Sequence, residues 1–462
     1  MSARVERADR VAPEGVAEAI GPSRMRRIVG LALPIVGAMA SQNVLNLVDV
    51  AMVGGLGDVA LAAVGMGSFV VFAAGAIPMG LAAGVQAVVA RRYGQGLDAI
   101  PALNGGLLLA VALGLPLTLV LVPLTPMLFP FLNRDPAVVA AGVPYVQIRL
   151  LAAVAVGMNF AFRGYWTGVN APRVYLRTLI VMHAANVVFD WALIYGRLGA
   201  PALGTVGAGI ASILATLLGS ACYFGAGLRH AWASSPLRAG FPDRTIVRTI
   251  LRLSVPAGMQ QLFFAAGFAA LYWIVGRIGT PELAATNVLI NVVLVAILPG
   301  MGLGLAATSL VGQALGRDDA HDAKAWGWDV AKVGAVCAAA LALPFLIAPG
   351  YILAPFLHHA ETLALARTPL RLVGLTLPFD VAGLVLLHAL FGAGDNRRVL
   401  LVSIALQWGL FLPIAWVVGP FGGYGLLGVW LVMGAWRIMQ AGACATIWQG
   451  DTWASAMPTK SP

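Results

Sequence analysis

Long apolar stretches recur from one end of the chain to the other, separated by short segments that are polar or rich in glycine and proline. A helix needs roughly 20 mostly apolar residues to cross a bilayer. The stretches that meet this length are 28–53, 61–89, 102–128, 137–161, 174–195, 204–226, 250–275, 283–312, 328–349, 368–390, 399–417 and 424–447. The pattern predicts an all-α integral membrane protein with twelve transmembrane helices.

The chain also contains an internal repeat, in which identical residues align at one shift of 222 positions. The aligned pairs include Pro34 with Pro256, Gly57 with Gly279, Gly80 with Gly302, and Gly94 with Gly316. Each half holds an even number of predicted spans, so both halves start from the same side of the membrane. The repeat therefore predicts two parallel six-helix lobes around a central cavity, an arrangement in which two halves rock against each other around a binding site.

The repeat and the apolar stretches together define the expected domain organisation. We expect an N-terminal tail at 1–27, an N-lobe at 28–226, a loop between the lobes at 227–249, a C-lobe at 250–447 and a C-terminal tail at 448–462. The N-terminal segment has no apolar core and does not resemble a cleaved signal peptide.

Composition and charge exclude a water-soluble protein and orient the chain. Hydrophobic residues make up 60% and charged residues only 10% of the sequence, whereas a soluble domain carries about 25% charged residues. The net charge of +10 is explained by topology, because most of the 29 lysines and arginines lie on the side that holds the N-terminus. The exceptions, predicted to lie outside, are Arg134, Arg149, Arg197, Arg277, Arg367 and Arg371. We therefore expect a multi-pass protein of the bacterial inner membrane with both termini in the cytoplasm, and no binding of nucleic acid.

Three acidic residues lie well inside the predicted spans, namely Asp49, Asp190 and Asp380. An ionisable side chain at this depth is costly, which makes each of them a candidate functional residue. Asp49 shares one helix face with Gln42 and Asn46, and Asp190 shares one with Asn186 four residues earlier. Two buried carboxyl groups in one lobe form a site that can gain and lose a proton near neutral pH.

The second half offers uncharged amides in place of acids. The repeat aligns Asp49 with Leu271, and the polar residues of the C-lobe spans are Gln260, Gln261, Asn287, Asn291 and Gln407. Hydrogen bonding between helices is the favoured role for most of these amides. His183 is expected to cap or pack rather than to relay protons, and the isolated Cys222, Cys337 and Cys444 to pack as small apolar residues.

The sequence holds no phosphate-binding GxxxxGK[ST] motif, and no cysteine or histidine cluster has metal-ligand spacing. We therefore expect no ATP, no bound metal and no cofactor beyond a coupling H⁺ or Na⁺. The expected partners are the lipid bilayer and small amphipathic or cationic substrates, and we expect the chain to act as a monomer.

Several motifs resemble those of the multidrug and toxic compound extrusion (MATE) family, and within it the DinF-like branch. They are the helix 1 run from Gln42 to Gly57, the Arg163-Gly164-Tyr165 segment with Gly168, Asn170 and Pro172, and the helix 5 run from Asn186 to Gly196. This resemblance covers nearly the whole chain. It implies cation-coupled export of amphipathic, often cationic compounds by alternating access, with no enzymatic activity.

The resemblance also implies residue roles. Asp49 corresponds to the protonation site of helix 1, within a network formed by Gln42, Asn186 and Asp190. A helix 6 hydroxyl that some members use for sodium falls nearest Ser212, so Asp49, Asp190, Asn186 and Ser212 form a possible Na⁺ site. The NorM-type branch uses a helix 7 glutamate that is absent here, and Asp380 matches its helix 10 aspartate. We therefore place coupling in the N-lobe, preferring the proton, and treat Asp380, Asn46, Gln260, Gln261, Asn287 and Asn291 as candidate contacts for a cation or the substrate.

Two alternatives stay open from the sequence. A flippase of lipid-linked precursors from the same superfamily would usually have fourteen spans and a strongly basic cavity, and neither is visible. A membrane enzyme would use Asp49 and Asp190 as an acid/base pair, but no nucleophile or metal constellation accompanies them.

Overall fold

The computed structural model describes residues 20–230 and 242–456, and these residues form helices without strands. Eleven helices are long and apolar enough to span a membrane, and a bent pair brings the number to twelve. This confirms the predicted fold class. Parts of the predicted tails and of the loop between the lobes lie outside the described residues.

The N-terminal half consists of α1 (Pro22–Gly54), α2 (Asp58–Gly94), α3 (Ile100–Leu128), α4 (Pro136–Leu151), α5 (Ala153–Gly168), α6 (Pro172–Tyr195) and α7 (Gly204–His230). The C-terminal half consists of α8 (Arg244–Gly276), α9 (Thr280–Gly316), α10 (Ala320–Ile347), the short α11 (Pro349–Leu353), α12 (Ala360–Ala393), α13 (Asn396–Ile404), α14 (Leu412–Trp416) and α15 (Gly425–Gln449). The π-helical segment Ala405–Phe411 joins α13 to α14, and a second one, Val417–Phe421, follows α14. Together these four segments form one candidate span, Asn396–Phe421.

The repeat seen in the sequence returns in the helix boundaries. The bounds of α8 are those of α1 shifted by 222 residues, and the bounds of α9 are those of α2 shifted by the same number. Later helices differ more between the halves. In the N-lobe the fourth span is broken at Ala152, where α4 and α5 meet at 50°, whereas α12 is one continuous helix of 34 residues.

The first helix of each half crosses from one lobe to the other. Ile28 and Leu31 of α1 belong to the hydrophobic core of the C-lobe, whereas Ile35 belongs to that of the N-lobe. In the same way, Ile250 at the start of α8 packs in the N-lobe core, and Leu271 packs in the C-lobe core. The crossings occur next to the aligned prolines Pro34 and Pro256, which remove a backbone hydrogen bond within each helix.

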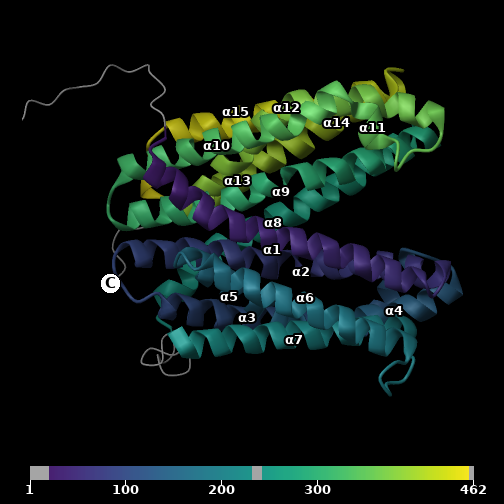
Figure 1. Ribbon diagram of the computed structural model, residues 1–462, viewed down its shortest axis with the longest axis horizontal. Helices are drawn as coiled ribbons and strands as arrows, with labels where there is room; N and C mark the ends of the chain where they lie inside the picture. Colours follow the sequence, from purple (N-terminus) through teal and green to yellow (C-terminus); the bar gives the residue numbers. More distant parts are fainter. Residues whose placement is uncertain (1–19, 231–241, 457–462) are drawn as a thin grey trace, which may run out of the picture.

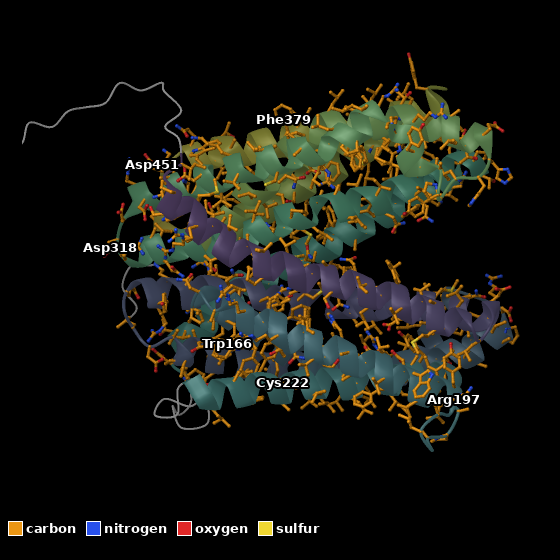
Figure 2. The ribbon with its side chains drawn as sticks, viewed as in Figure 1. Trp166, Arg197, Cys222, Asp318, Phe379 and Asp451 are labelled. Carbon is orange, nitrogen blue, oxygen red and sulfur yellow. The ribbon has the colours of Figure 1, made fainter. Side chains whose placement is uncertain are left out.

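The two lobes lie side by side, and their ribbons approach each other most closely towards the end that holds the C-terminus (Figure 1). At this end α2 packs against α8 and α9. Glycines allow the close approach, because a Cβ atom at Gly84 would collide with Ser254 and one at Gly94 with the backbone of Gln313. Asp318 and Asp451 lie at this end, and Arg197 at the opposite one (Figure 2).

Candidate functional site

The two N-lobe acids meet between α1 and α6. Asp190 of α6 is buried, with 2% of its surface exposed, and its carboxyl group lies near that of Asp49 on α1, the helix that packs against α6. The side-chain amide of Asn186 donates to Asp190 Oδ2 at 2.6 Å. Two neighbouring carboxylates repel each other, and a proton shared between them relieves this repulsion. The structure thus brings together three of the residues that the sequence singled out.

A second group of polar side chains lies on the same two helices, closer to their N-terminal ends than Asp49 and Asp190. Gln42 Oε1 lies 3.1 Å from His183 Nε2, and Ser41 Oγ lies 2.8 Å from His183 Nδ1. The amide of Gln42 also donates to Asn46 Oδ1 at 3.1 Å. Since an amide oxygen only accepts, His183 Nε2 carries the proton and its Nδ1 accepts from the serine hydroxyl. Gln42 therefore belongs to a histidine-centred chain of hydrogen bonds one to two turns from Asp49.

Arg149 is the residue of this site that the sequence analysis missed. It lies near the end of α4, at the break before α5, and its Nη1 donates to Ser212 Oγ of α7 at 2.7 Å. Its guanidinium also lies 5.9 Å from the centre of the Tyr145 ring. The positive charge of Arg149 is within electrostatic reach of Asp49 and Asp190, but its side chain forms no ion pair with either carboxyl group. The charge pattern counts this arginine on the outer side of the membrane, and the structure shows it half-buried and bonded to Ser212.

In the C-lobe, Asp380 is paired with a cation of the chain itself. Arg437 Nη1 of α15 lies 3.3 Å from Asp380 Oδ1 of α12, and both side chains are largely buried. The pair lines a pocket between α8, α9, α12 and α15, together with Trp430, whose buried indole N–H has no hydrogen-bond acceptor. A cationic ligand at Asp380 would therefore compete with Arg437 for the carboxylate. The role of Asp380 as a contact for a cation or the substrate stays a prediction.

The C-lobe amides divide into two groups. Gln407 is buried in a π-helical segment and donates to the backbone carbonyl of Phe264. Asn287 and Asn291 of α9 are exposed, and Asn287 Oδ1 accepts from Tyr272 Oη at 3.2 Å. Exposed amides at bilayer depth cannot face lipid without cost, so we infer that they line the space between the lobes. Gln260 and Gln261 of α8 are half-buried.

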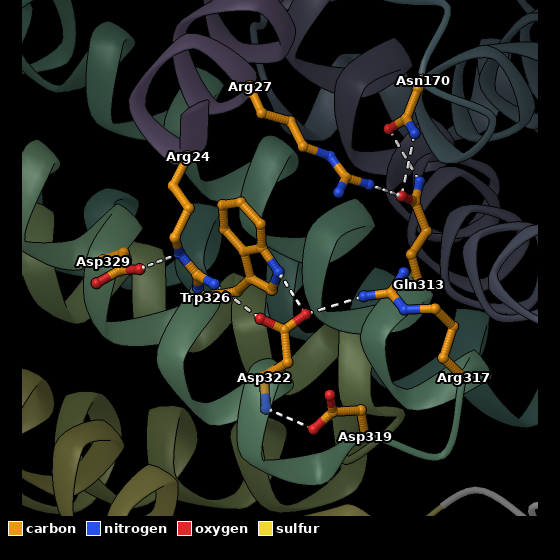
Figure 3. A network of polar contacts seen from close by, with 9 residues as sticks. All are labelled: Arg24, Arg27, Asn170, Gln313, Arg317, Asp319, Asp322, Trp326 and Asp329. Atoms are coloured by element: carbon orange, nitrogen blue, oxygen red, sulfur yellow. Dashed lines mark hydrogen bonds and ion pairs between the residues drawn. The ribbon is translucent and has the colours of Figure 1, made fainter. Parts of the chain in front are cut away.

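A polar network closes the lobe boundary at the end that holds the C-terminus (Figure 3). Arg24, in the first turn of α1, reaches two aspartates of α10: its Nη1 lies 2.7 Å from Asp322 Oδ1 and its Nε 2.6 Å from Asp329 Oδ2. The guanidinium of Arg24 stacks on Trp326 at 3.7 Å from the ring centre. Arg317 adds a second positive charge at Asp322, 2.9 Å away. These contacts tie the start of α1 to the C-lobe.

The same network continues towards the N-lobe through Gln313 of α9. Its side-chain oxygen accepts from Arg27 at 2.7 Å and from Asn170 at 3.0 Å, and its amide nitrogen donates to the carbonyl of Gly168 at 2.9 Å. Asn170 has a positive φ of 61°, a conformation that asparagine tolerates better than most residues. About one helical turn before Gln313 on α9, Ser309 Oγ accepts from Gln86 of α2 at 2.9 Å. The lobes are thus joined by buried hydrogen bonds as well as by surface ion pairs.

A sodium site formed by Asp49, Asp190, Asn186 and Ser212 stays a prediction. Asn186 donates to Asp190, and the hydroxyl of Ser212 accepts a hydrogen bond from Arg149. Within the described residues, no group of three or more His, Cys, Asp or Glu side chains is placed to hold a metal ion.

Comparison with known proteins places this site in a family. The model of the MatE family matches residues 34–192 and 256–436, one match in each half. The "Probable multidrug resistance protein NorM" of Pseudomonas aeruginosa is 29% identical over 435 residues, covering 92% of this chain and 88% of the relative. The protein of that name from Bradyrhizobium diazoefficiens is also 29% identical, covering 89% and 90%. Assignment to the DinF-like branch stays a prediction.

Solved structures share the fold. The "Outward-facing conformation of a multidrug resistance MATE family transporter of the MOP superfamily" superposes with a TM-score of 0.84 at 22% identity, covering 92% of this chain and 95% of that one. A structure described as "MATE in the bent conformation" gives the same TM-score and coverage. At this identity the likeness establishes the fold alone.

Proposed function

Because the chain belongs to the MatE family, we propose that it is a proton-coupled antiporter that exports amphipathic, often cationic small molecules by alternating access. Family membership makes it a multi-pass membrane transporter rather than an enzyme. Its relatives are named multidrug resistance proteins, which supports drugs or toxic metabolites as substrates. Their bacterial origin and the charge pattern support the bacterial inner membrane, with both termini in the cytoplasm.

The observation that carries this proposal is that Asp49 of α1 and the buried Asp190 of α6 lie near each other on two packed helices of the N-lobe. A carboxyl pair with one proton carries one negative charge, and it becomes neutral when a second proton binds. The aligned position in the C-lobe is the buried Leu271, and the acid of that lobe, Asp380, is paired with Arg437, so we place proton exchange in the N-lobe.

Exchange follows from competition between a proton and a cationic substrate. Asp49 is half-buried, and its neighbour Asn46 is exposed, so the pair is reached from the space between the lobes. A proton entering from outside neutralises the carboxylate and weakens the hold on a cationic substrate, which leaves. A new substrate binding from the cytoplasm favours loss of that proton inwards. A ligand can drive such a cycle only through its different affinities for the two states.

Alternating access also requires that one end of the protein be closed, and we assign this role to the tight contacts between the lobes at the cytoplasmic end. Gln86, Gln313 and the Arg24 network hold that end closed, so this conformation exposes the site to the outside. Turning inwards requires these contacts to break and the lobes to close at the opposite end. The structural likeness to an outward-facing transporter supports this assignment.

Purified protein in liposomes tests the coupling ion. A fluorescent cation such as ethidium serves as the substrate, with a pH gradient and a sodium gradient imposed separately and protein-free liposomes as the control. We expect transport with the pH gradient and none with the sodium gradient. Transport driven by sodium alone would replace the proton with a metal ion. No transport with either gradient would contradict drug antiport and favour the flippase.

A further inference from the structure

The C-lobe contains a pocket between α8, α9, α12 and α15 that the proton-exchange mechanism does not use. Its walls are mostly apolar, and the polar side chains that line it are Thr376, Asp380, Trp430 and Arg437. Leu294 of α9 also lines the pocket and is exposed. It follows Asn291 by three residues and Asn287 by seven, so these exposed side chains share one helix face. The pocket therefore opens beside the amides that we place in the space between the lobes.

The wall that α8 gives to this pocket differs in character from the equivalent helix of the N-lobe. The shift of 222 residues aligns Gln42 and Asn46 of α1 with Phe264 and Phe268 of α8. Phe268 lines the pocket, and the guanidinium carbon of Arg437 lies 5.6 Å from the centre of the Phe264 ring. Aromatic rings thus replace amides on this face, and such a surface favours aromatic or apolar molecules.

Two side chains at the pocket have hydrogen-bond donors to spare. Trp430 is 2% exposed, and its indole N–H has no acceptor among the residues that the structure describes. The guanidinium of Arg437 carries several N–H groups, and within the described part of the chain Asp380 is its one hydrogen-bond partner. A buried donor without an acceptor is costly. A ligand that brings an acceptor oxygen therefore gains binding energy here.

The ion pair in the pocket decides which charge a ligand can carry. Arg437 and Asp380 lie 3.3 Å apart, and both side chains are largely buried. A cation would compete for the carboxylate and an anion for the guanidinium. Either would leave the displaced partner buried and unpaired, which is strongly unfavourable. An uncharged acceptor, such as a carbonyl oxygen, satisfies the spare N–H groups and leaves the pair intact.

We propose that this C-lobe pocket is a second ligand site, which binds uncharged aromatic or apolar molecules through a carbonyl-type acceptor. Arg437 and Trp430 donate to the acceptor, and Phe268 packs against the adjoining part of the molecule. The pocket has room for only a small group in this conformation, so the rest of the ligand extends past Leu294 along the amide face of α9. The site goes beyond the proposed antiport, which concerns cations at the N-lobe acids.

Nile red and Nile blue are matched probes for this site. They share one aromatic core, and Nile red carries a carbonyl oxygen where Nile blue carries a cationic nitrogen group. Binding to the purified protein is measured by equilibrium dialysis with the same detergent on both sides. We expect saturable binding of Nile red to wild type. Trp430→Phe, which keeps a ring but removes the N–H, should weaken this binding about five-fold or more.

Leu294→Trp is the second variant, and it places a larger side chain at the exposed mouth of the pocket. It should remove the saturable binding of Nile red, and its exposed position keeps the test valid if Trp430→Phe does not fold. Trp273→Phe is the matched control, since Trp273 is an exposed tryptophan of α8 outside the pocket lining. We expect this control to bind Nile red with wild-type affinity.

Nile blue binding should be the same in wild type and in all three variants, because a cation does not enter the pocket. No saturable binding of Nile red by wild type would overturn the proposal, and so would wild-type affinity in folded Trp430→Phe or Leu294→Trp. A loss of Nile blue binding in these two variants would overturn the selectivity for uncharged ligands. Because the readout is binding of an uncharged dye, its failure is distinct from a failure of cation antiport, which ethidium transport reveals.

Discussion

Asp49→Asn is expected to reduce ethidium transport driven by a pH gradient to the rate of protein-free liposomes. The amide has nearly the shape of the carboxyl group but cannot gain or lose a proton. An amide N–H at this position can still donate a hydrogen bond to the neighbouring Asp190 carboxylate. The variant should therefore fold and insert, yet it has no difference in proton affinity with which to drive the cycle. Initial rates in proteoliposomes with equal amounts of protein provide the measurement.

Asp58→Asn is the matched control for this substitution. Asp58 is an exposed aspartate at the start of α2 in the same lobe, outside the carboxyl pair. We expect it to transport at close to the wild-type rate. Wild-type transport by folded Asp49→Asn would contradict the assignment of the coupling proton to this pair.

Arg24→Ala is expected to shift the protein towards its inward-facing state. The change removes the ion pairs with Asp322 and Asp329 and the stacking on Trp326. Arg24 and the two aspartates are partly exposed to water, whereas Trp326 is buried, and we assign the lost contacts about 1–2 kcal/mol in total. A change of this size alters the ratio of the two states by roughly 5–30-fold. Hydrogen exchange read by mass spectrometry should then rise in residues 305–316 of α9 and 84–94 of α2, which pack together at the closed end.

Arg398→Ala separates this effect from a general loss of surface charge. Arg398 pairs with Asp395 at 3.2 Å within the C-lobe and does not cross the lobe boundary. We expect its exchange pattern at 305–316 and 84–94 to match wild type. Equal exchange in Arg24→Ala and wild type would show that the network around Arg24 does not hold the closed end.

The architecture could be predicted from the sequence because the positions and lengths of membrane helices follow from the apolar stretches. The apolar stretches must match the bilayer, and the aligned glycines and prolines fix where each repeat turns. The bounds of α1, α2, α8 and α9 accordingly reproduce the shift of 222 residues. The break at Ala152 was not predicted, because the apolar stretch runs through it without a helix-breaking pattern.

The acidic pair was predictable for a different reason. A carboxyl group at bilayer depth needs a polar partner, and the N-lobe offers few residues that can serve Asp49 and Asp190. Gln42 was expected next to Asp49 but bonds with His183, since the sequence shows only that both lie on polar helix faces. The distance between those faces is set by how α1 packs on α6.

The roles of the arginines depended on tertiary structure. Arg149 lies in the middle of the apolar stretch 137–161, and the sequence shows no partner for its charge there. Its burial depends on the bend after α4 and on a hydroxyl 63 residues away on α7. Likewise Arg437 and Asp380 are 57 residues apart, on two helices that no local pattern connects. Such pairings follow from helix packing and not from residue spacing.

Proton release on substrate binding tests the central claim, exchange at the Asp49–Asp190 pair, most directly. Ethidium is added to purified protein in weakly buffered detergent solution, and the released protons are read with a pH-sensitive dye. The account predicts release of about one proton for each wild-type molecule that binds substrate, since the pair titrates as a unit, and none from Asp49→Asn. Binding of ethidium by wild type without proton release, or equal release from Asp49→Asn, would contradict it.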